Sequence, residues 1–231
     1  MKERQKLQKE ALEILSRCQG YSEFLVSYFE RFLGKNVLEV GSGIGNITSL
    51  LVKKGRVVVP SDIDKESLKT LNLKFGNAAF LDITSEISKE LIGKFDSVVV
   101  LNVLEHIKDD FEALINIKKL LKDRGKLIIL VPGHRFLYSQ YDKKVGHQRR
   151  YSLKGLKEKL GQTGFKITKL NFVNKLGALG WFYNFKIAKR TSFPKPLIVS
   201  INAISCLIKF IDRLFPFPFG LSIICIAQKE E

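Results

Sequence analysis

Cysteine is scarce in this sequence, which has three such residues among 231: Cys18, Cys206 and Cys225. An odd number of cysteines without close spacing argues against a disulfide framework and against a structural zinc site. We therefore expect a reducing, cytoplasmic setting.

Long apolar runs are also missing, since no stretch approaches the roughly 20 residues that a membrane-spanning helix requires. The N-terminal segment KERQKLQKEALEILSRC has no apolar core of the kind found in secretory signals. Its apolar residues Leu7, Leu12, Ile14 and Leu15 predict an amphipathic helix instead, packed on the sheet or closing over a ligand.

Acidic residues are few, with 23 Asp and Glu against 39 Lys and Arg, for a formal charge of +16. Residues 143–190 contain Glu158 as their single acid. A basic face of this kind suits nucleic acid, an anionic membrane or a phosphorylated small molecule, or is simply a solvated lysine-rich surface.

Short apolar, β-branched runs alternate with helical patterns over the first two thirds of the chain, which predicts an α/β fold with a parallel sheet. We expect one domain over residues 1–231, with an N-terminal helical extension (1–34), a ligand-binding half (35–132) and a basic, apolar C-terminal part (133–231). The predicted strands are Val37–Val40, Val57–Pro60, Ala78–Leu81, Ser97–Leu101, Leu127–Val131, Phe165–Phe172 and Leu221–Gln228, and one predicted helix is Phe111–Leu121.

The segment NVLEVGSGIGNIT (36–48) is a buried-strand pattern that runs into a glycine loop and a helix. Glycines at 41, 43 and 45 let the backbone turn sharply and leave its N–H groups open to a ligand. Asn46 stands where the dinucleotide pattern G-x-G-x-x-G has its third glycine. Glu39, just before the loop, would face a cation better than a pyrophosphate, so the pattern favours a nucleoside ligand with an ammonium group and no phosphates.

Acidic residues follow the next two predicted strands. Asp62 comes about 20 residues after Gly41, where α/β folds place a carboxylate on a ribose hydroxyl. Asp82 ends the following strand, and residues 95–106 (FDSVVVLNVLEH) form another strand and turn. We interpret Asp64 as the N-cap of the helix KESLKTLNLKF.

These four segments together resemble the cofactor-binding motifs of the class I S-adenosylmethionine-dependent methyltransferases, in a small-molecule subgroup related to the quinone-pathway enzymes. The resemblance implies a Rossmann-like, seven-stranded mixed sheet with helices on both faces, N-terminal helices, an antiparallel last strand paired with Phe165–Phe172, and a helical insertion before it. It implies S-adenosyl-L-methionine as cofactor and S-adenosyl-L-homocysteine as product. The cofactor-binding residues it implies are Glu39, Gly41, Ser42, Gly43, Gly45, Asn46, Asp62, Ile63, Asp82, Ile83, Asn102 and Val103.

The segment after the fifth predicted strand is dense in aromatic and basic residues, as expected of a loop that shapes a ligand pocket. Its G-H-x-R-R-Y stretch resembles the corresponding loop of the same subgroup. The acceptor-binding residues predicted from it are His134, Tyr138, Tyr141, Arg149, Arg150 and Tyr151.

Methyl transfer from a sulfonium is an in-line displacement that needs a base only where the acceptor must lose a proton. His106 and His147 are the candidates for that base, because imidazole titrates near neutrality. Some quinone-pathway relatives carry Glu-x-x-Glu-His after strand four, whereas this chain has Asn102 at the first position. With one carboxylate fewer we predict no bound metal.

The tail has apolar residues at helical spacing: Leu197, Ile201, Ile204, Ile208, Ile211 and Phe215. Packing on the core, an acceptor lid, a dimer contact and an anionic membrane surface remain open for this face. We predict a cytoplasmic or peripheral enzyme that methylates a small or lipid-like acceptor, most simply at oxygen. The alternatives are an RNA methyltransferase, which lacks motif support here, and a non-catalytic cofactor-binding protein. The oligomeric state is left open.

Overall fold

The structure is a computed structural model, and it describes residues 19–190, 192, 205, 207–212, 214 and 218–230. The predicted N-terminal amphipathic helix lies outside this part of the chain. Cys18, Cys206 and four of the six residues of the predicted apolar face (Leu197, Ile201, Ile204 and Phe215) lie outside it as well.

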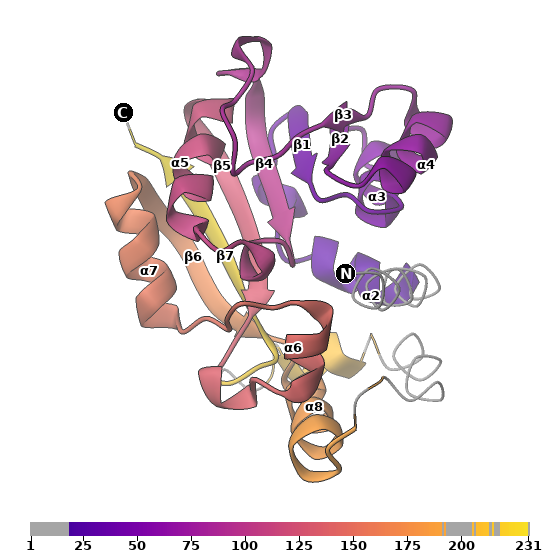
Figure 1. Cartoon of the computed structure of the whole chain (residues 1–231), viewed down its shortest axis with the longest axis vertical. Coiled ribbons are helices and arrows are strands. Elements are labelled where there is room, and N and C mark those ends of the chain that lie inside the picture. Colours follow the sequence, from indigo (N-terminus) through magenta and orange to yellow (C-terminus); the bar gives the residue numbers. More distant parts are fainter. Residues whose placement is uncertain are drawn as a thin grey trace.

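The centre of the molecule is a seven-stranded sheet with the strand order β3-β2-β1-β4-β5-β7-β6 (Figure 1). Strands β1 to β5 are parallel to one another, and β7 runs antiparallel to both β5 and β6. The predicted mixed sheet with an antiparallel last strand is thereby confirmed. The strands are β1 (Asn36–Val40), β2 (Val57–Asp62), β3 (Ala79–Phe80), β4 (Phe95–Leu101), β5 (Leu121–Pro132), β6 (Phe165–Val173) and β7 (Ser222–Lys229).

Helices connect the strands and cover both faces of the sheet (Figure 1). The α-helices are α2 (Gln19–Val26), α3 (Asn46–Lys53), α4 (Lys65–Phe75), α5 (Asp110–Leu120), α6 (Gln140–Val145), α7 (Leu153–Gln162) and α8 (Lys175–Trp181). Single turns of 3₁₀ helix are η1 (Glu30–Phe32), η2 (Lys89–Leu91), η3 (Leu104–His106) and η4 (Arg135–Leu137), and a π-helical turn, η5 (Phe182–Ile187), continues α8.

Side-chain caps fix where several helices begin. The Asp64 carboxylate accepts from the Ser67 amide at 2.8 Å, which confirms its predicted role as the N-cap of α4. Asp109 caps α5 and Ser152 caps α7 in the same way. Each cap satisfies a backbone N–H that the helix itself leaves unpaired.

Alternate residues of the strands belong to two separate hydrophobic layers, one on each face of the sheet. Residues such as Val98, Val100 and Ile129 pack with α5 and α7, and residues such as Val99 and Ile128 pack with α2 and α3. Full burial of both strand faces is the reason why the parallel strands are continuously apolar in the sequence.

Strand β5 is longer than predicted, beginning at Leu121 rather than Leu127. Leu121 pairs with Phe95, and the register then shifts before Ser97 pairs with Lys126. The polar sequence KDRG hides this irregular start, because it interrupts the apolar pattern on which the prediction depends.

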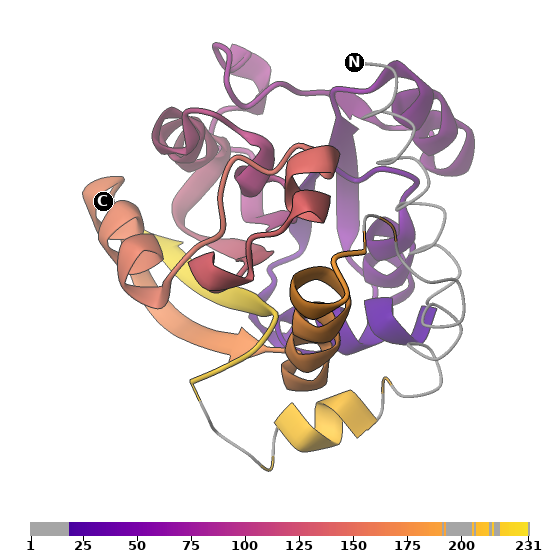
Figure 2. The same ribbon diagram turned by 60° about the horizontal axis from the view of Figure 1, so that its bottom comes forward.

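The described part of the C-terminal insertion packs on the core. Ile208 is buried in the layer of α2 and α3, whereas Leu207, Phe210 and Leu214 are exposed. Asp212 accepts from the Asn174 amide at 2.6 Å and from the Tyr28 hydroxyl at 2.7 Å, so it joins this helical segment to the start of α8 and to the N-terminal region (Figure 2). Among the described residues no helix is both long and apolar enough to cross a membrane.

Candidate functional site

The candidate site lies at the carboxyl ends of β1, β2 and β4, and the segment after β5 extends it. In Figure 1 the arrowheads of β4 and β5 point toward the region where α6 and α8 gather. Because parallel strands end at one edge of the sheet, their loops meet there.

The glycine loop after β1 has the geometry that its sequence predicts. Gly41, Gly43 and Gly45 all have positive φ, at 70°, 55° and 83°. The Ser42 amide donates to the Ser61 carbonyl at 2.9 Å, so the loop is tied to β2. The Gly43 amide donates to the Asp62 carboxylate at 2.9 Å. Asp62 therefore lies directly against the loop, with its second oxygen accepting from the Asp64 amide at 2.9 Å.

Glu39 lies beneath this loop. Its side chain accepts from the Thr48 hydroxyl on α3, and its carbonyl accepts from Ser42 and Ser61 hydroxyls at 3.1 and 2.8 Å. Burial raises the pKa of Glu39 to about 7. The side chain and carbonyl of Glu39 are thus hydrogen-bonded within the protein, and Thr48, the partner of its carboxyl, lies on α3, which begins at Asn46.

The residues at the ends of β2 and β3 differ in exposure. Ile63 is 63% exposed and open to a ligand, whereas Ile83 is 3% exposed and packs in the α5 layer. Hydrogen bonds from Thr84 lower the pKa of Asp82, whose carboxylate accepts from the Thr84 amide at 2.9 Å. Asp82 is thus held as an anion, and Ile83 forms part of the floor below it.

The turn after β4 approaches the glycine loop. A Cβ added at Gly41 would lie 2.5 Å from Cγ2 of Val103, so no side chain fits there. Asn102 has a positive φ of 55°, and its amide donates to the Leu130 carbonyl at 2.8 Å. The structure therefore brings Asn102 and Val103 beside Gly41, as expected for one site.

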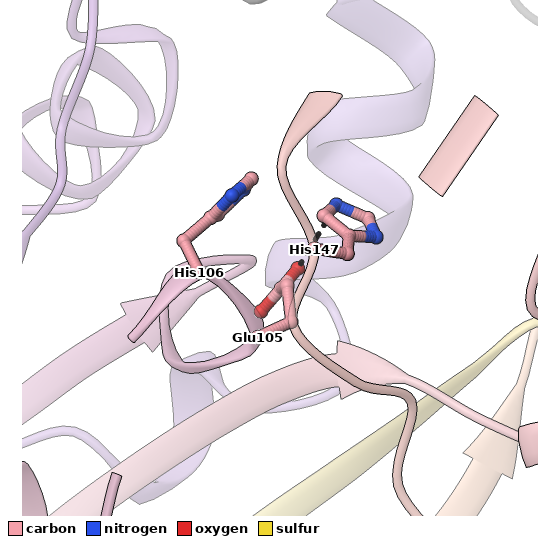
Figure 3. Close-up of side chains that lie close together, drawn as sticks. All are labelled: Glu105, His106 and His147. Carbon is pink, nitrogen blue, oxygen red and sulfur yellow. Dashed lines mark ion pairs between the residues drawn. The ribbon is translucent and has the colours of Figure 1, made fainter. Parts of the chain in front are cut away.

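Glu105 and His106, which follow this turn, form a cluster with His147 from the segment after α6 (Figure 3). The two imidazole rings meet edge to face with centroids 4.7 Å apart. Glu105 Oε1 lies 4.0 Å from His147 Nε2, and neither carboxyl oxygen of Glu105 has a hydrogen-bond partner among the described residues. Burial raises the pKa of Glu105 to about 8, so this carboxyl is mainly neutral at pH 7 and the approach to His147 is not a formed ion pair.

Asp142 holds His147 from the other side. Its Oδ1 lies 2.7 Å from His147 Nδ1 and 3.0 Å from Nε of the buried Arg150. These hydrogen bonds overcome the effect of burial and lower the pKa of Asp142. An anionic Asp142 fixes the proton on Nδ1 and leaves Nε2 directed toward Glu105 and His106.

The same cluster bears on the predicted absence of a metal. His147 adds a third donor to Glu105 and His106, and the three donor atoms lie within 4.8 Å of one another. One neutral carboxyl and two imidazoles are a poor set for Mg²⁺, which prefers several oxygen ligands, and they would suit a transition metal better. That no metal is bound stays a prediction.

Four of the six predicted acceptor residues gather on the far side of His147. The Tyr138 hydroxyl donates to the His147 carbonyl at 2.8 Å. Arg150 donates to the Gly133 carbonyl and stacks 4.4 Å from the Trp181 ring centroid. Arg149 and Tyr151 both reach Asp110, each at 2.6 Å.

The other two predicted acceptor residues, His134 and Tyr141, are neighbours of these four: the His134 amide donates to the Tyr151 carbonyl at 2.9 Å, and Tyr141 packs on the Trp181 ring that Arg150 covers. His134 stacks on Phe172 with ring centroids 4.1 Å apart, and burial lowers its pKa. Tyr141 is buried against Trp181 and Phe185. His134 Nε2 also accepts from the Gly220 amide at 3.4 Å.

Sequence reasoning did not single out Asp142, Asp110 or the buried carboxyl of Glu105 as site residues. Ser139 and Asp142 form a capping box for α6, so the sequence indicates only a helix start there. The available signal for Asp142 is its position five residues before His147, on a short helix that leads directly into the G-H-x-R-R-Y stretch.

Comparisons with known proteins agree with this geometry. The sequence model of a family described as "Methyltransferase domain" matches residues 7–170. The juvenile hormone acid O-methyltransferase of Bombyx mori is 32% identical over 117 residues, which are 47% of this chain and 42% of that protein. A ubiquinone biosynthesis O-methyltransferase of Pseudomonas paraeruginosa is 31% identical over 101 residues, 42% of this chain and 44% of that protein. The chain thus spans about half the length of these curated relatives.

Solved structures share the fold. A SAM-dependent methyltransferase from Archaeoglobus fulgidus superposes with a TM-score of 0.62 at 24% identity, covering 90% of this chain and 92% of that one. A putative sarcosine dimethylglycine methyltransferase from Galdieria sulphuraria gives the same TM-score at 15% identity, covering 90% and 84%. At these identities the likeness concerns the fold.

The buried carboxyl of Glu105 predicts a pH dependence of stability. Folded Glu105 keeps its proton up to a pH of about 8, whereas the unfolded chain releases it near the ordinary value of 4.5. The folded state therefore loses stability as pH rises between these values, by up to roughly 1.4 kcal/mol per pH unit. In urea unfolding from about pH 5 to 8, the free energy of unfolding of Glu105→Gln should fall less steeply with pH than that of the wild type.

Glu39 contributes a similar pH dependence of the unfolding free energy to the wild type and to Glu105→Gln, so the difference between the two proteins reports Glu105 alone. Glu158→Gln is the matched control, because that carboxylate is exposed on α7 and should leave the wild-type slope unchanged. Equal slopes for the wild type and Glu105→Gln would show that Glu105 is ionised in the folded protein.

Proposed function

The chain belongs to the methyltransferase-domain family, and from this premise we propose that it transfers a methyl group to an oxygen atom of a small or amphiphilic acceptor. The family assignment makes it an S-adenosylmethionine-dependent methyltransferase and confirms the predicted class, fold and cofactor. Relatives include O-methyltransferases and a ubiquinone/menaquinone biosynthesis C-methyltransferase of Blochmanniella pennsylvanica, 29% identical over 135 residues. The acceptor atom is therefore part of the proposal.

The residues around the glycine loop fit the cofactor. Asp62 would accept from the ribose hydroxyls, and the exposed Ile63 would cover one side of the adenine. Asp82 is held as an anion and would face the adenine amino group. Asn102 and Val103, next to Gly41, would line the methionine end. The cofactor supplies an electrophilic methyl on a sulfonium, and the protein's task is to orient it.

Replacing Asp62 tests this assignment. We expect Asp62→Ala to weaken S-adenosylhomocysteine binding by roughly tenfold or more, the scale of a lost hydrogen bond to a charged group. Asp62→Asn keeps one acceptor oxygen, so its affinity for S-adenosylhomocysteine should lie between those of the wild type and Asp62→Ala. Calorimetric titration measures the dissociation constants, with NAD and a short RNA as parallel ligands.

Asp123→Ala serves as the control for loss of one carboxylate, because the Asp123 side chain is 88% exposed. A folded Asp62→Ala protein with unchanged affinity would remove Asp62 from the site. A wild-type protein that binds NAD or RNA and not S-adenosylhomocysteine would contradict the cofactor-binding role of the whole loop.

The pairing of His147 with Asp142 is the observation that supports an oxygen acceptor. A buried carboxylate at 2.7 Å orients the imidazole and stabilises the cation that forms when it takes a proton. A hydroxyl acceptor needs such a base. The acceptor oxygen would bond to the methyl carbon as the carbon–sulfur bond breaks, the bonding pair would stay on sulfur, and the hydroxyl proton would pass to His147 Nε2.

His147→Asn should lower kcat by roughly a hundredfold or more, the usual contribution of a general base. His106→Asn is the matched comparison, because it removes the adjacent imidazole while keeping Asp142 and His147, and it should retain most of the activity. Turnover is measured with labelled S-adenosylmethionine over a panel of hydroxyl acceptors, and the methylated atom is identified by NMR.

Methyl transfer to nitrogen or carbon would contradict the proposal, as would full activity in His147→Asn. Circular dichroism and S-adenosylhomocysteine binding show whether each variant is folded before its rate is interpreted.

We further propose that the enzyme is cytoplasmic and associates with anionic membrane surfaces. Exposed apolar side chains on α8, η5 and the segment 207–214 include Leu179, Phe182, Ile187, Leu207 and Phe210. These helices lie close together, because Asp212 accepts from the Lys175 amide at 3.0 Å (Figure 2). The same segments carry basic residues: Lys186 lies on η5, Lys189 and Arg190 follow it, and Lys209 lies in the segment 207–214. Apolar anchors beside basic groups suit an anionic headgroup layer.

Sedimentation with lipid vesicles tests this association. The wild type should bind vesicles containing phosphatidylserine more than phosphatidylcholine vesicles, and added salt should weaken the binding. The double variant Phe182→Ser/Phe210→Ser should lose most of it. Leu73→Ser removes an 81% exposed apolar residue from α4 and should bind like the wild type. Equal sedimentation of the wild type with both lipids would contradict the proposal.

A further inference from the structure

A cavity of about 410 Å³ lies beside the acceptor segment. It is bounded by the turn η4 and the residue after it, the stretch that follows His147 and one side of α7 as far as Lys159. Its lining includes Arg135, Tyr138, Arg149, Arg150, Tyr151 and Lys159, together with the first turn of α7. Four lining residues are cations and none is an acid, so the lining favours negative charge.

The carboxylates behind the lining do not balance these four cations. Asp110 pairs with Arg149 at 2.6 Å and also with Lys159. Asp142 pairs with Arg150 at 3.0 Å. Arg135 is exposed and has no carboxylate partner among the described residues. Two carboxylates against four cations leave an excess of two positive charges around the cavity.

The cations differ in how they reach a ligand. The Arg150 side chain is 1% exposed and fixed by Asp142, so it acts as part of the wall. The side chains of Arg149 and Lys159 are 31% and 26% exposed. Each has more N–H donors than its contacts use, since guanidinium offers five and ammonium three. Arg135, Arg149 and Lys159 can therefore donate to an added anion.

The cavity shares a wall with the proposed catalytic histidine. The Tyr138 hydroxyl, at the cavity, donates to the His147 carbonyl at 2.8 Å. Arg150 and His147 both bind the same oxygen of Asp142, Oδ1. The cavity lining thus adjoins the segment that carries His147, within reach of an extended acceptor.

We infer that this cavity binds the acidic group, a carboxylate or a phosphate, of the methyl acceptor. The inference rests on the proposed function and specifies its substrate: a molecule with a hydroxyl at the reacting end and an anionic group at the other. Bidentate and charge-assisted donation from arginine is the usual recognition of both anions. The volume also accommodates the carbon atoms next to the acidic group.

Anion binding is tested with phenyl phosphate and benzoate as probes, by calorimetric titration of the full chain saturated with S-adenosylhomocysteine. At least one probe should bind to the wild type. Arg135→Ala should weaken it by roughly tenfold, because it removes a charged donor that has no carboxylate partner in the protein. Lys157→Ala, which removes an exposed cation from the outer face of α7, should bind like the wild type.

Turnover gives the second measurement. Hydroxyl acceptors are compared in pairs that differ by an acidic group, such as a hydroxybenzoate and its methyl ester. The acid should be the better substrate, and Arg135→Ala should raise its KM about tenfold with little change in kcat. The neutral ester should respond to Arg135→Ala by less than twofold.

The outcomes separate this inference from the proposed function. If the protein binds S-adenosylhomocysteine and neither probe, or if Arg135→Ala and Lys157→Ala bind the probe equally, the anion site is wrong and methyl transfer stands. If S-adenosylhomocysteine itself does not bind, the methyltransferase site is wrong. Competition of phenyl phosphate with vesicles of phosphatidic acid would assign the cavity to a lipid headgroup, and absence of competition to a soluble acid.

Discussion

The buried carboxylate of Asp142 is the contact on which the acceptor side of the site depends. It accepts from the Ser139 amide at 2.8 Å at the start of α6, from His147 at 2.7 Å and from Arg150 at 3.0 Å. Arg150 in turn binds the Gly133 carbonyl at the end of β5 and covers Trp181 of α8. One carboxylate therefore connects the strand end, the acceptor segment and the C-terminal insertion. A buried anion is stable only when donors surround it, so these elements keep one arrangement.

The parallel sheet supplies the other half of the site by a simpler constraint. Neighbouring strands β2, β1 and β4 end together, so Asp62 contacts Gly43 and Val103 lies against Gly41, although these pairs are about 20 and 60 residues apart in sequence. Their positions depend on strand pairing and on backbone amides rather than on side-chain networks.

This difference explains how far the sequence could predict the molecule. The alternation of parallel strands and helices and the glycine loop follow from apolar periodicity and glycine spacing, which are local signals, whereas the antiparallel last strand was implied by the resemblance to the methyltransferases. The start of β5 and the burial of Ile83 were not predicted, because a register shift and a choice of sheet face depend on neighbours far along the chain. The contacts of Asp142, Asp110 and Tyr141 are of the same kind. A capping box and a tyrosine carry no sequence signal for the partners they find after folding.

The two carboxyls on either side of His147 show why those long-range contacts matter for chemistry. Asp142 and Glu105 are both buried, yet hydrogen bonds lower the pKa of the first, whereas burial without such hydrogen bonds raises the pKa of the second to about 8. An anion on the Nδ1 side orients the ring and supports a developing positive charge. A second anion on the Nε2 side would favour a proton already bound at Nε2, the atom that must take the acceptor's proton. Neutral Glu105 avoids that competition, and it also avoids leaving two unsolvated negative charges beside one imidazole. One buried carboxyl is thus an anion and the other is neutral. The number of hydrogen-bond donors that the fold brings to each carboxyl decides its charge.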